Sequence, residues 1–224
     1  MNNKLSFDYT LTLDPCDIDS IQYITYEEQV IIERWLTSPK FSSDLYVIND
    51  NEDILATYCG KFVRTSWRPW EDGFIAVDFT FENNSAYAKE KHNFYYEGLS
   101  DNWTFMVDCD TDELEEYTYP VITITNPDGG HIVLTNTTDT GAINSIDVLT
   151  HQDVPMVIDC RHCILTDGVT NATLSFDDIG WTDVGNIYWP RLLPGVNTFT
   201  VDKPCQIEMS FETVSKKVGG WLYD

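Results

Sequence analysis

The residues that could carry chemistry begin with a pair of cysteines. Cys160 and Cys163 are separated by two residues, which is the spacing of zinc ligands, but a structural zinc ion needs four ligands and the sequence has no second pair of this kind. Cys109, Cys205 or His151 could complete the set only if folding brought one of them close. Because unpaired cysteines are commonly buried as small apolar side chains, we expect Cys160 and Cys163 to flank a β-turn instead.

An acidic segment is the second candidate, as a calcium site. Asp108, Asp110 and Asp112 have the spacing that opens a calcium-binding loop. Such a loop needs glycine at its sixth position and glutamate at its twelfth, where this chain has Glu113 and Tyr119. The sequence therefore excludes an EF-hand and leaves open a weak cation site among the carboxylates.

Motifs of common enzyme classes do not occur. The sequence contains no Gly-x-Ser-x-Gly elbow, no phosphate-binding loop and no His-Glu-x-x-His motif, and its four histidines are scattered. Pairs of carboxylates carry no information about glycoside hydrolysis in a chain with 37 acidic residues. We predict a protein that is not an enzyme and that uses no cofactor.

The chain has a large excess of acidic over basic residues. Its 224 residues include 13 Lys and Arg and 37 Asp and Glu, a formal net charge of −24. Binding to nucleic acid or to anionic lipid requires a basic surface, so we expect neither partner. The sequence has no apolar run of the roughly 20 residues that span a bilayer, and its first residues lack the apolar core of a signal peptide. We therefore expect synthesis in the cytoplasm.

The elements that must position these residues are mostly strands. Thr25 and Glu28 form a capping box for one helix over residues 26–37, with Ile31, Ile32, Trp35 and Leu36 as its buried stripe. Residues 82–91 form a polar stretch with one possible helical turn. Alternating apolar residues predict strands elsewhere. The predicted strands are 5–13, 44–48, 56–66, 75–81, 103–107, 121–125, 131–134, 156–159, 172–175, 197–201 and 205–211.

Such short strands, with turn residues between them, predict a mainly β protein of two domains, the second a β-sandwich; a family resemblance, carried by the residues named next, implies a β-sandwich with one helix for the first. The expected domains are residues 1–100, which include the helix, and residues 101–224.

Three stretches resemble the distal tail proteins of siphovirus-type bacteriophages. The first is Trp189-Pro190 followed by a Leu193-Pro194-Gly195 turn, Asn197 and a final strand. Pro194 and Gly195 suit a type II turn, and the Asn197 amide can bind back to it. The others are the Trp35-Leu36 pair that ends the helical stripe and the strand containing Phe79 and Phe81.

This resemblance implies a structural role in the virion, at the distal end of the tail. The first domain of the family forms a homohexameric ring around the DNA channel, and the second, galectin-like domain points outward. The implied partners are copies of the chain itself, the tail tube protein, the tail-associated protein and the receptor-binding proteins. We also expect the C-terminal residues Trp221, Leu222 and Tyr223 to dock on this chain or on a neighbouring copy.

A carbohydrate-binding module for surface adhesion is the alternative function. Trp67, Trp70, Trp181, Trp189 and Trp221 lie in loop-like or terminal contexts, where exposed rings could stack on sugars. Buried, the same rings would be ordinary core residues. Coplanar exposed aromatics in a groove would favour sugar binding, whereas a flat apolar surface on the first domain would favour a ring.

Overall fold

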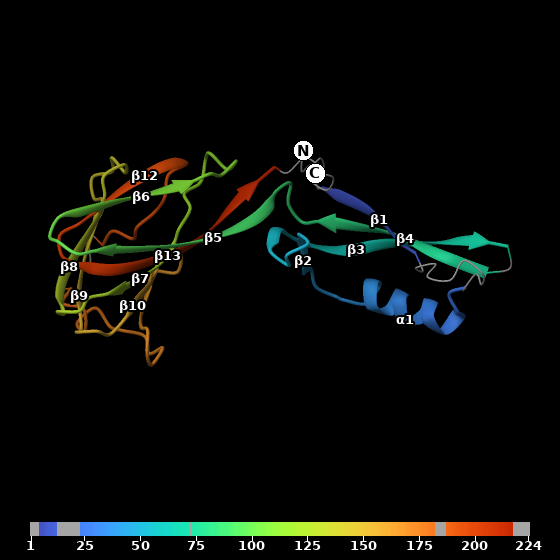
Figure 1. The fold of residues 1–224 in the computed structure, drawn as a ribbon, viewed down its shortest axis with the longest axis horizontal. Coiled ribbons are helices and arrows are strands. Elements are labelled where there is room, and N and C mark those ends of the chain that lie inside the picture. Colours follow the sequence, from blue (N-terminus) through green and yellow to red (C-terminus); the bar gives the residue numbers. More distant parts are fainter. Residues whose placement is uncertain (1–4, 13–22, 72, 182–186, 217–224) are drawn as a thin grey trace. The chain divides into compact units, whose positions relative to one another are not determined.

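The computed structural model describes residues 5–12, 23–71, 73–181 and 187–216 (Figure 1). The protein is mainly β, as predicted, and within these residues the helix α1 is too short and too polar to cross a bilayer. The elements in chain order are β1 (Ser6–Thr12), α1 (Tyr26–Thr37), β2 (Ser43–Ile48), β3 (Ile54–Trp70), β4 (Gly73–Asn83), β5 (Ala88–Gly98), β6 (Trp103–Cys109), β7 (Val121–Thr125), β8 (Gly130–Asn136), β9 (Ser145–Thr150), β10 (Met156–Asp159), β11 (Ile164–Asp167), β12 (Gly195–Val201) and β13 (Cys205–Ser215).

The described residues form two compact units. The first contains the residues up to Lys89 together with Lys216, and the second contains residues 90–215. The chain therefore passes between the units inside β5, eleven residues before the end of the domain predicted as residues 1–100.

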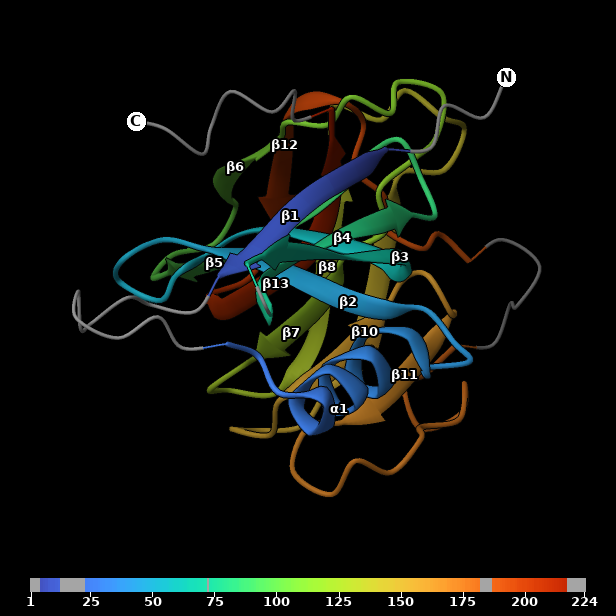
Figure 2. The same cartoon turned by 90° about the vertical axis from the view of Figure 1, so that its right-hand side faces the viewer.

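In the first unit, the strands pair in the order β1-β4-β3-β2 (Figure 2). The rings of Phe7 and Tyr9 lie opposite Phe81 and Phe79 across the β1–β4 pair, which confirms the predicted strand at these phenylalanines. A small core of buried residues lies on this face of the sheet. Its members are Ala56, Tyr58, Phe81 and Ala88.

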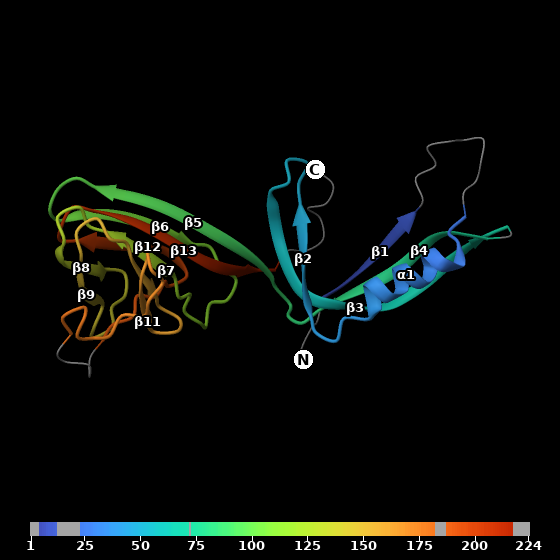
Figure 3. The same ribbon diagram turned by 90° about the horizontal axis from the view of Figure 1, so that it is seen from below.

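The helix α1 begins and ends where its sequence predicts. The Glu28 amide donates to Thr25 Oγ1 and the Thr25 amide donates to Glu28 Oε2, so the predicted capping box is present. The helix contacts β3 and runs along it (Figure 3). The Trp67 indole on β3 fixes the helix further by donating a hydrogen bond to Glu33.

The predicted burial of the helical stripe is wrong. Leu36 is buried and Ile32 is half-buried, but Ile31 and Trp35 are 66% and 72% exposed. Helical spacing gives the reason: Ile32 and Leu36 lie four residues apart on the face toward β3, whereas Ile31 and Trp35 form a neighbouring row that turns away from it. An apolar pattern thus indicates a face that avoids water without saying what covers it.

The helical turn predicted within residues 82–91 is also wrong, because this stretch belongs to two strands and the short connection between them. Strand β4 continues to Asn83, and β5 begins at Ala88. The buried Asn83 side chain closes this connection by donating hydrogen bonds to the carbonyls of Ser85 and Tyr87. Strand β5 was missed because Glu90 and His92 interrupt the apolar row on its inner side, which Phe94 and Tyr96 continue, and because the outward Tyr95 blurs the alternation.

The second unit is a β-sandwich. One sheet has the order β5-β13-β7-β10-β11, the other has the order β6-β12-β8-β9, and the main core lies between them. Fully buried side chains such as Ile122 and Phe199 come from both sheets. Strands β9 and β11 were not predicted. Residues 172–175, predicted as a strand, contribute a single bridge from Thr173 to β11.

Candidate functional site

The segment that leads into β12 contains most of the residues on which the resemblance rests. Gly195 has φ of +88°, a conformation that glycine adopts without strain, as the predicted turn requires. The buried Asn197 side chain closes this turn: its Oδ1 accepts from the Leu193 amide at 2.9 Å, and its Nδ2 donates to the carbonyls of Leu193 and Gly195 at 2.7 and 2.9 Å. Side-chain hydrogen bonds therefore hold the turn, whose two ends also pair with neighbouring segments, Leu192 with Thr118 and Gly195 with β6.

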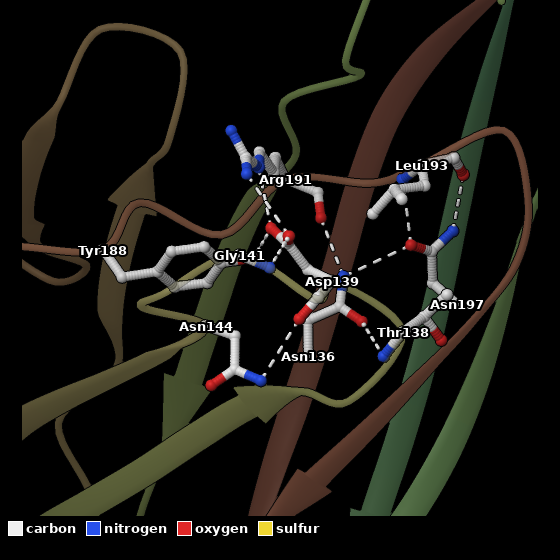
Figure 4. A network of polar contacts seen from close by, with 9 residues as sticks. All are labelled: Asn136, Thr138, Asp139, Gly141, Asn144, Tyr188, Arg191, Leu193 and Asn197. Carbon is white, nitrogen blue, oxygen red and sulfur yellow. Dashed lines mark hydrogen bonds and ion pairs between the residues drawn. The ribbon is translucent and has the colours of Figure 1, made fainter.

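Asn136, at the end of β8, connects this turn to the rest of the unit (Figure 4). Its Nδ2 donates to Asn197 Oδ1 at 3.2 Å and to the carbonyl of Arg191 at 2.9 Å. Its Oδ1 accepts from the Thr138 amide at 3.1 Å. Both Asn136 and Asn197 are completely buried, so these bonds satisfy polar groups that water does not reach.

Asp139 is the centre of the second half of the network. Its carboxylate accepts from Arg191 Nε at 2.7 Å and Nη2 at 3.2 Å, from the Tyr188 hydroxyl at 3.0 Å and from the Gly141 amide at 3.0 Å. The Arg191 guanidinium also lies over the Tyr117 ring, 4.0 Å from its centre. This hydrogen-bonded ion pair joins the loop after β8 to the segment before β12 (Figure 4).

The electrostatics of this pair suit a fixed structural role. The Arg191 guanidinium lowers the pKa of Asp139, while burial raises the pKa of the Tyr188 hydroxyl beside it. Asp139 therefore stays ionised and Tyr188 stays protonated. With four donors on one carboxylate, Asp139 has no lone pair directed at a substrate, so the arrangement fixes two loops and performs no acid–base chemistry.

Sequence reasoning named only part of this network. Asn197 and its turn were identified, but Asn136, Asp139, Tyr188 and Arg191 were not. The one available signal was the rarity of basic residues, because Arg191 is one of four Lys and Arg residues in residues 90–215. An isolated arginine in an acidic sandwich requires a carboxylate partner, although the sequence does not say which.

The side chains of the other family residues do not take part in this hydrogen-bond network. Trp189 is half-buried against Trp181, Pro190 is buried, and Pro194 is exposed in the turn. Trp35, Leu36, Phe79 and Phe81 belong to the first unit. The predicted docking residues Trp221, Leu222 and Tyr223 lie outside the described residues.

The cysteines and carboxylates considered as metal ligands have other positions. Cys160 and Cys163 lie on the turn between β10 and β11, with Cys160 buried and Cys163 exposed. Burial raises the pKa of the Cys160 thiol. The acidic segment after β6 is held by Thr111, whose hydroxyl donates to the Val214 carbonyl at 3.2 Å. Among the described residues, no three His, Cys, Asp or Glu side chains are arranged to hold a metal ion.

Of the tryptophans considered as sugar platforms, Trp67, Trp181 and Trp189 are half-buried, Trp70 is 52% exposed, and Trp221 lies outside the described residues. Trp181 packs on the core of the second unit, and its indole donates to the Asp147 carbonyl. Trp67 is half-buried and bonded to Glu33. A cavity of about 360 Å³ on the first unit is lined mainly by polar groups, including the ion pair of Arg68 and Asp78. These positions do not form an aromatic platform within the described part of the chain.

Among the described residues, eleven large apolar side chains are exposed on each unit, and those of the first unit include two groups. One group, the α1 surface, consists of Ile31 and Trp35, which lie four residues apart on one side of the helix. A second group, the hairpin surface, consists of Tyr46, Ile48 and Ile54 on β2 and β3. Apolar groups of this size that stay in water are typical of surfaces that bind another protein.

Comparison with known proteins gives one family match and a shared fold. A family model described as a phage tail C-terminal domain matches residues 86–211, which nearly coincide with the second unit. No curated protein matches the chain. The crystal structure of Dit from phage SPP1, a hub adsorption apparatus protein of phages infecting Gram-positive bacteria, is similar with a TM-score of 0.58 and 14% identity, over 93% of this chain and 78% of that one.

Two structures of the phage P2 baseplate in its activated conformation also match. The calcium form has a TM-score of 0.39 and 11% identity, over 86% of this chain and 75% of that one. The strontium form has a TM-score of 0.42 and 10% identity, over 97% and 87%. The shared fold is therefore inferred from the SPP1 protein alone.

Proposed function

The chain belongs to the phage tail C-terminal domain family, and we propose that it is a non-enzymatic hub subunit that forms a ring at the distal end of a phage tail. In this proposal the first unit forms the ring and the second, galectin-like unit points outward. The ring connects the tail tube protein to the tail-associated protein and carries receptor-binding proteins. The shared fold with the SPP1 hub protein supports this role.

The α1 surface is the observation that carries the proposal. Its side chains follow an apolar pattern that predicts burial, yet in the single chain Ile31 and Trp35 face water. Covering them with a different surface of the next copy gives a head-to-tail contact, and such contacts close into a ring when their rotation permits. The second unit has a large apolar core between its two sheets, and it also exposes apolar side chains such as Met106 and Val196.

The distribution of charge fits a hub through which DNA passes. Residues 1–89, most of the first unit, contain 15 acidic and 7 basic residues, a net charge of −8. An acidic protein repels DNA and does not hold it, so DNA can leave without binding the hub. The same excess of carboxylates disfavours contact with anionic lipid.

The proposal is tested by measuring the mass of the purified full chain by light scattering. The wild type should give a closed oligomer, for which the resemblance implies six copies. Replacing Ile31→Ser and Trp35→Ser should leave a folded monomer, because both side chains point away from the fold of their own chain. The control replaces Met106→Ser and Val196→Ser, two exposed apolar residues of the second unit, and should keep the oligomer. An oligomer unaffected by the α1 changes would refute the proposed contact.

A further inference from the structure

We propose that Asp128 is a site of spontaneous modification, at which the folded chain converts aspartate to isoaspartate. The sequence has three Asp-Gly pairs, Asp72-Gly73, Asp128-Gly129 and Asp167-Gly168. Of their aspartates, Asp72 lies outside the described residues. The structure exposes the reacting groups at Asp128 and restrains those at Asp167, so it distinguishes two sites that have the same sequence neighbour.

The reaction joins a side-chain carboxyl group to the backbone nitrogen of the next residue. The nitrogen attacks the carboxyl carbon, a C–N bond forms, and the carboxyl hydroxyl leaves with the amide proton as water, which gives a five-membered cyclic imide. Water then adds to one of the two imide carbonyl carbons, and the C–N bond at that carbon breaks. Opening at the main-chain carbonyl gives isoaspartate, and opening at the side-chain carbonyl restores aspartate. The reaction consumes no oxidant, and glycine favours it because no side chain shields the attacking nitrogen.

The turn at Asp128 leaves both reacting groups accessible. It connects β7 to β8 and passes from one sheet of the second unit to the other. Asp128 is exposed, and among the described residues no group donates a hydrogen bond to its carboxylate. The Gly129 amide donates to the Asn126 carbonyl at 3.3 Å, beyond the usual limit of about 3.2 Å, and that carbonyl also accepts from the Asp153 amide at 3.0 Å. The attacking nitrogen is therefore only weakly held.

The fold also requires glycine after Asp128. Gly129 has φ of +69°, and a Cβ atom added there would lie 3.0 Å from the backbone nitrogen of Gln152. Gly130 follows with φ of +97°. Residues with side chains rarely adopt these angles, so the turn keeps an unshielded nitrogen beside the Asp128 carboxyl group.

Asp167 has the same neighbour but different surroundings. Its Oδ1 accepts from the Thr170 amide at 2.7 Å, from the Thr170 hydroxyl at 2.9 Å and from the Val169 amide at 2.9 Å. These hydrogen bonds, those from Thr170 first, lower the pKa of Asp167, so its carboxylate stays ionised and does not readily lose an oxygen as water. The Gly168 amide donates to the Pro155 carbonyl at 2.7 Å. Both reacting groups are therefore held at this site.

Isoaspartate at position 128 adds a methylene group to the main chain inside the turn. The Asp128 amide donates to Asn126 Oδ1 at 3.1 Å, and Asn126 Nδ2 donates to Thr150 Oγ1 at 3.0 Å. Asn126 is buried, so displacing these bonds leaves polar groups without partners and destabilises this end of the second unit. A hub subunit of the kind proposed above is not renewed after assembly, so isoaspartate accumulates as the particle ages.

The experiment ages the purified full chain in water labelled with heavy oxygen, which enters each residue that forms and reopens the imide. Proteolysis and mass spectrometry then compare the peptides that contain Asp128 and Asp167. A parallel sample in concentrated guanidinium chloride provides the unfolded chain, in which the two pairs should react at similar rates. The variant Asp128→Glu keeps the charge but would have to form a less favourable six-membered ring, so it should take up no label at this position.

In the folded chain, Asp128 should take up label at least about tenfold faster than Asp167, a ratio that corresponds to about 1.4 kcal/mol in the reaction barrier. The aged wild type should melt at a lower temperature than the fresh chain, and the aged Asp128→Glu variant should not. Equal labelling of the two residues in the folded chain, or label at Asp128 that appears only in denaturant, would overturn the inference. A labelled chain with an unchanged melting temperature would refute the effect on the turn. Neither result bears on the proposed ring, because the reaction belongs to the single chain.

Discussion

Asp139 is a buried carboxylate in the second unit whose position is fixed by a cation and several hydrogen-bond donors. Its side chain is almost fully buried, and a buried carboxylate is tolerated only with a cation and hydrogen bonds to offset its lost hydration. Arg191 supplies the cation, and Tyr188 and Gly141 supply further donors. The pair therefore fixes the loop after β8 and the segment before β12 in one arrangement.

Replacing Asp139→Ala should destabilise the second unit by about 3 kcal/mol, because it leaves the Arg191 guanidinium and the Tyr188 hydroxyl without their partner. Urea unfolding followed by tryptophan fluorescence measures the change. The control is Asp147→Ala, whose ion pair with His131 is exposed on both sides and should contribute less than about 1 kcal/mol. Equal losses in the two variants would contradict a structural role for the Asp139 network.

The same carboxylate predicts how stability depends on pH. The folded state lowers the pKa of Asp139, chiefly through the hydrogen bonds from Arg191, so its contribution is present above the ordinary value of 3.8 and is lost as pH falls toward the lowered value. The difference in unfolding free energy between wild type and Asp139→Ala should stay constant from neutral pH to about 4 and shrink below it. A difference that stays constant down to pH 2.5 would show that Asp139 is not stabilised in its charged form.

Asn197 gives a third prediction at this scale. Replacing Asn197→Asp preserves the shape of the side chain but removes the amide that donates to the carbonyls of Leu193 and Gly195. It also places a charge where water has no access, so a loss of about 3 kcal/mol or more is expected from urea unfolding. A variant as stable as the wild type would mean that the turn is held by other contacts.

At the scale of elements, the helix and strands that were predicted correctly are those whose sequence signals lie within a few residues of one another. The capping box of Thr25 and Glu28 gave the start of α1, because this signal acts within a few residues. The alternating apolar rows gave β4, β7 and β13 for the same reason. Strand β5 could not be found in this way, since its inner row contains the polar Glu90 and His92 and its outer row contains Tyr95, so apolar and polar residues do not alternate cleanly.

The candidate site shows the same limit. Pro194 and Gly195 specify a turn from their own conformational preferences, and Asn197 lies close enough in sequence to bind it. The contact between Asp139 and Arg191 joins residues 52 positions apart, and it exists because β8 and β12 are antiparallel neighbours in one sheet, which places the end of β8 beside the start of β12. With 37 carboxylates in the chain, spacing alone could not select the partner of Arg191.

The turn before β12 can be tested separately from its side-chain bonds. A Cβ atom added at Gly195 would meet no neighbour within 4 Å, so Gly195→Ala introduces only the cost of the positive φ angle. We expect a loss of about 1 kcal/mol in unfolding free energy, since the left-handed conformation costs an alanine about 1–2 kcal/mol and the stiffer unfolded chain returns part of it. A loss above about 3 kcal/mol would show that the turn is packed more tightly than its geometry indicates.

At the scale of the whole molecule, charge opposes the assembly that the apolar surfaces favour. Each copy has a net charge of −24, and salt screens such repulsion over about 8 Å at physiological ionic strength. Ring formation should therefore strengthen as salt rises from 50 mM to about 500 mM, because the apolar contact is not weakened by screening. Light scattering across a salt series measures this, and rings that fall apart at high salt would indicate an interface held by ion pairs instead.

The measurement that bears most directly on the hub proposal is electron microscopy of the purified full chain at about 500 mM salt. We predict particles with a closed ring and a central hole, in which the first units form the inner circle and the second units lie outside it. Single particles with the mass of one chain, at every salt and protein concentration, would contradict the proposal.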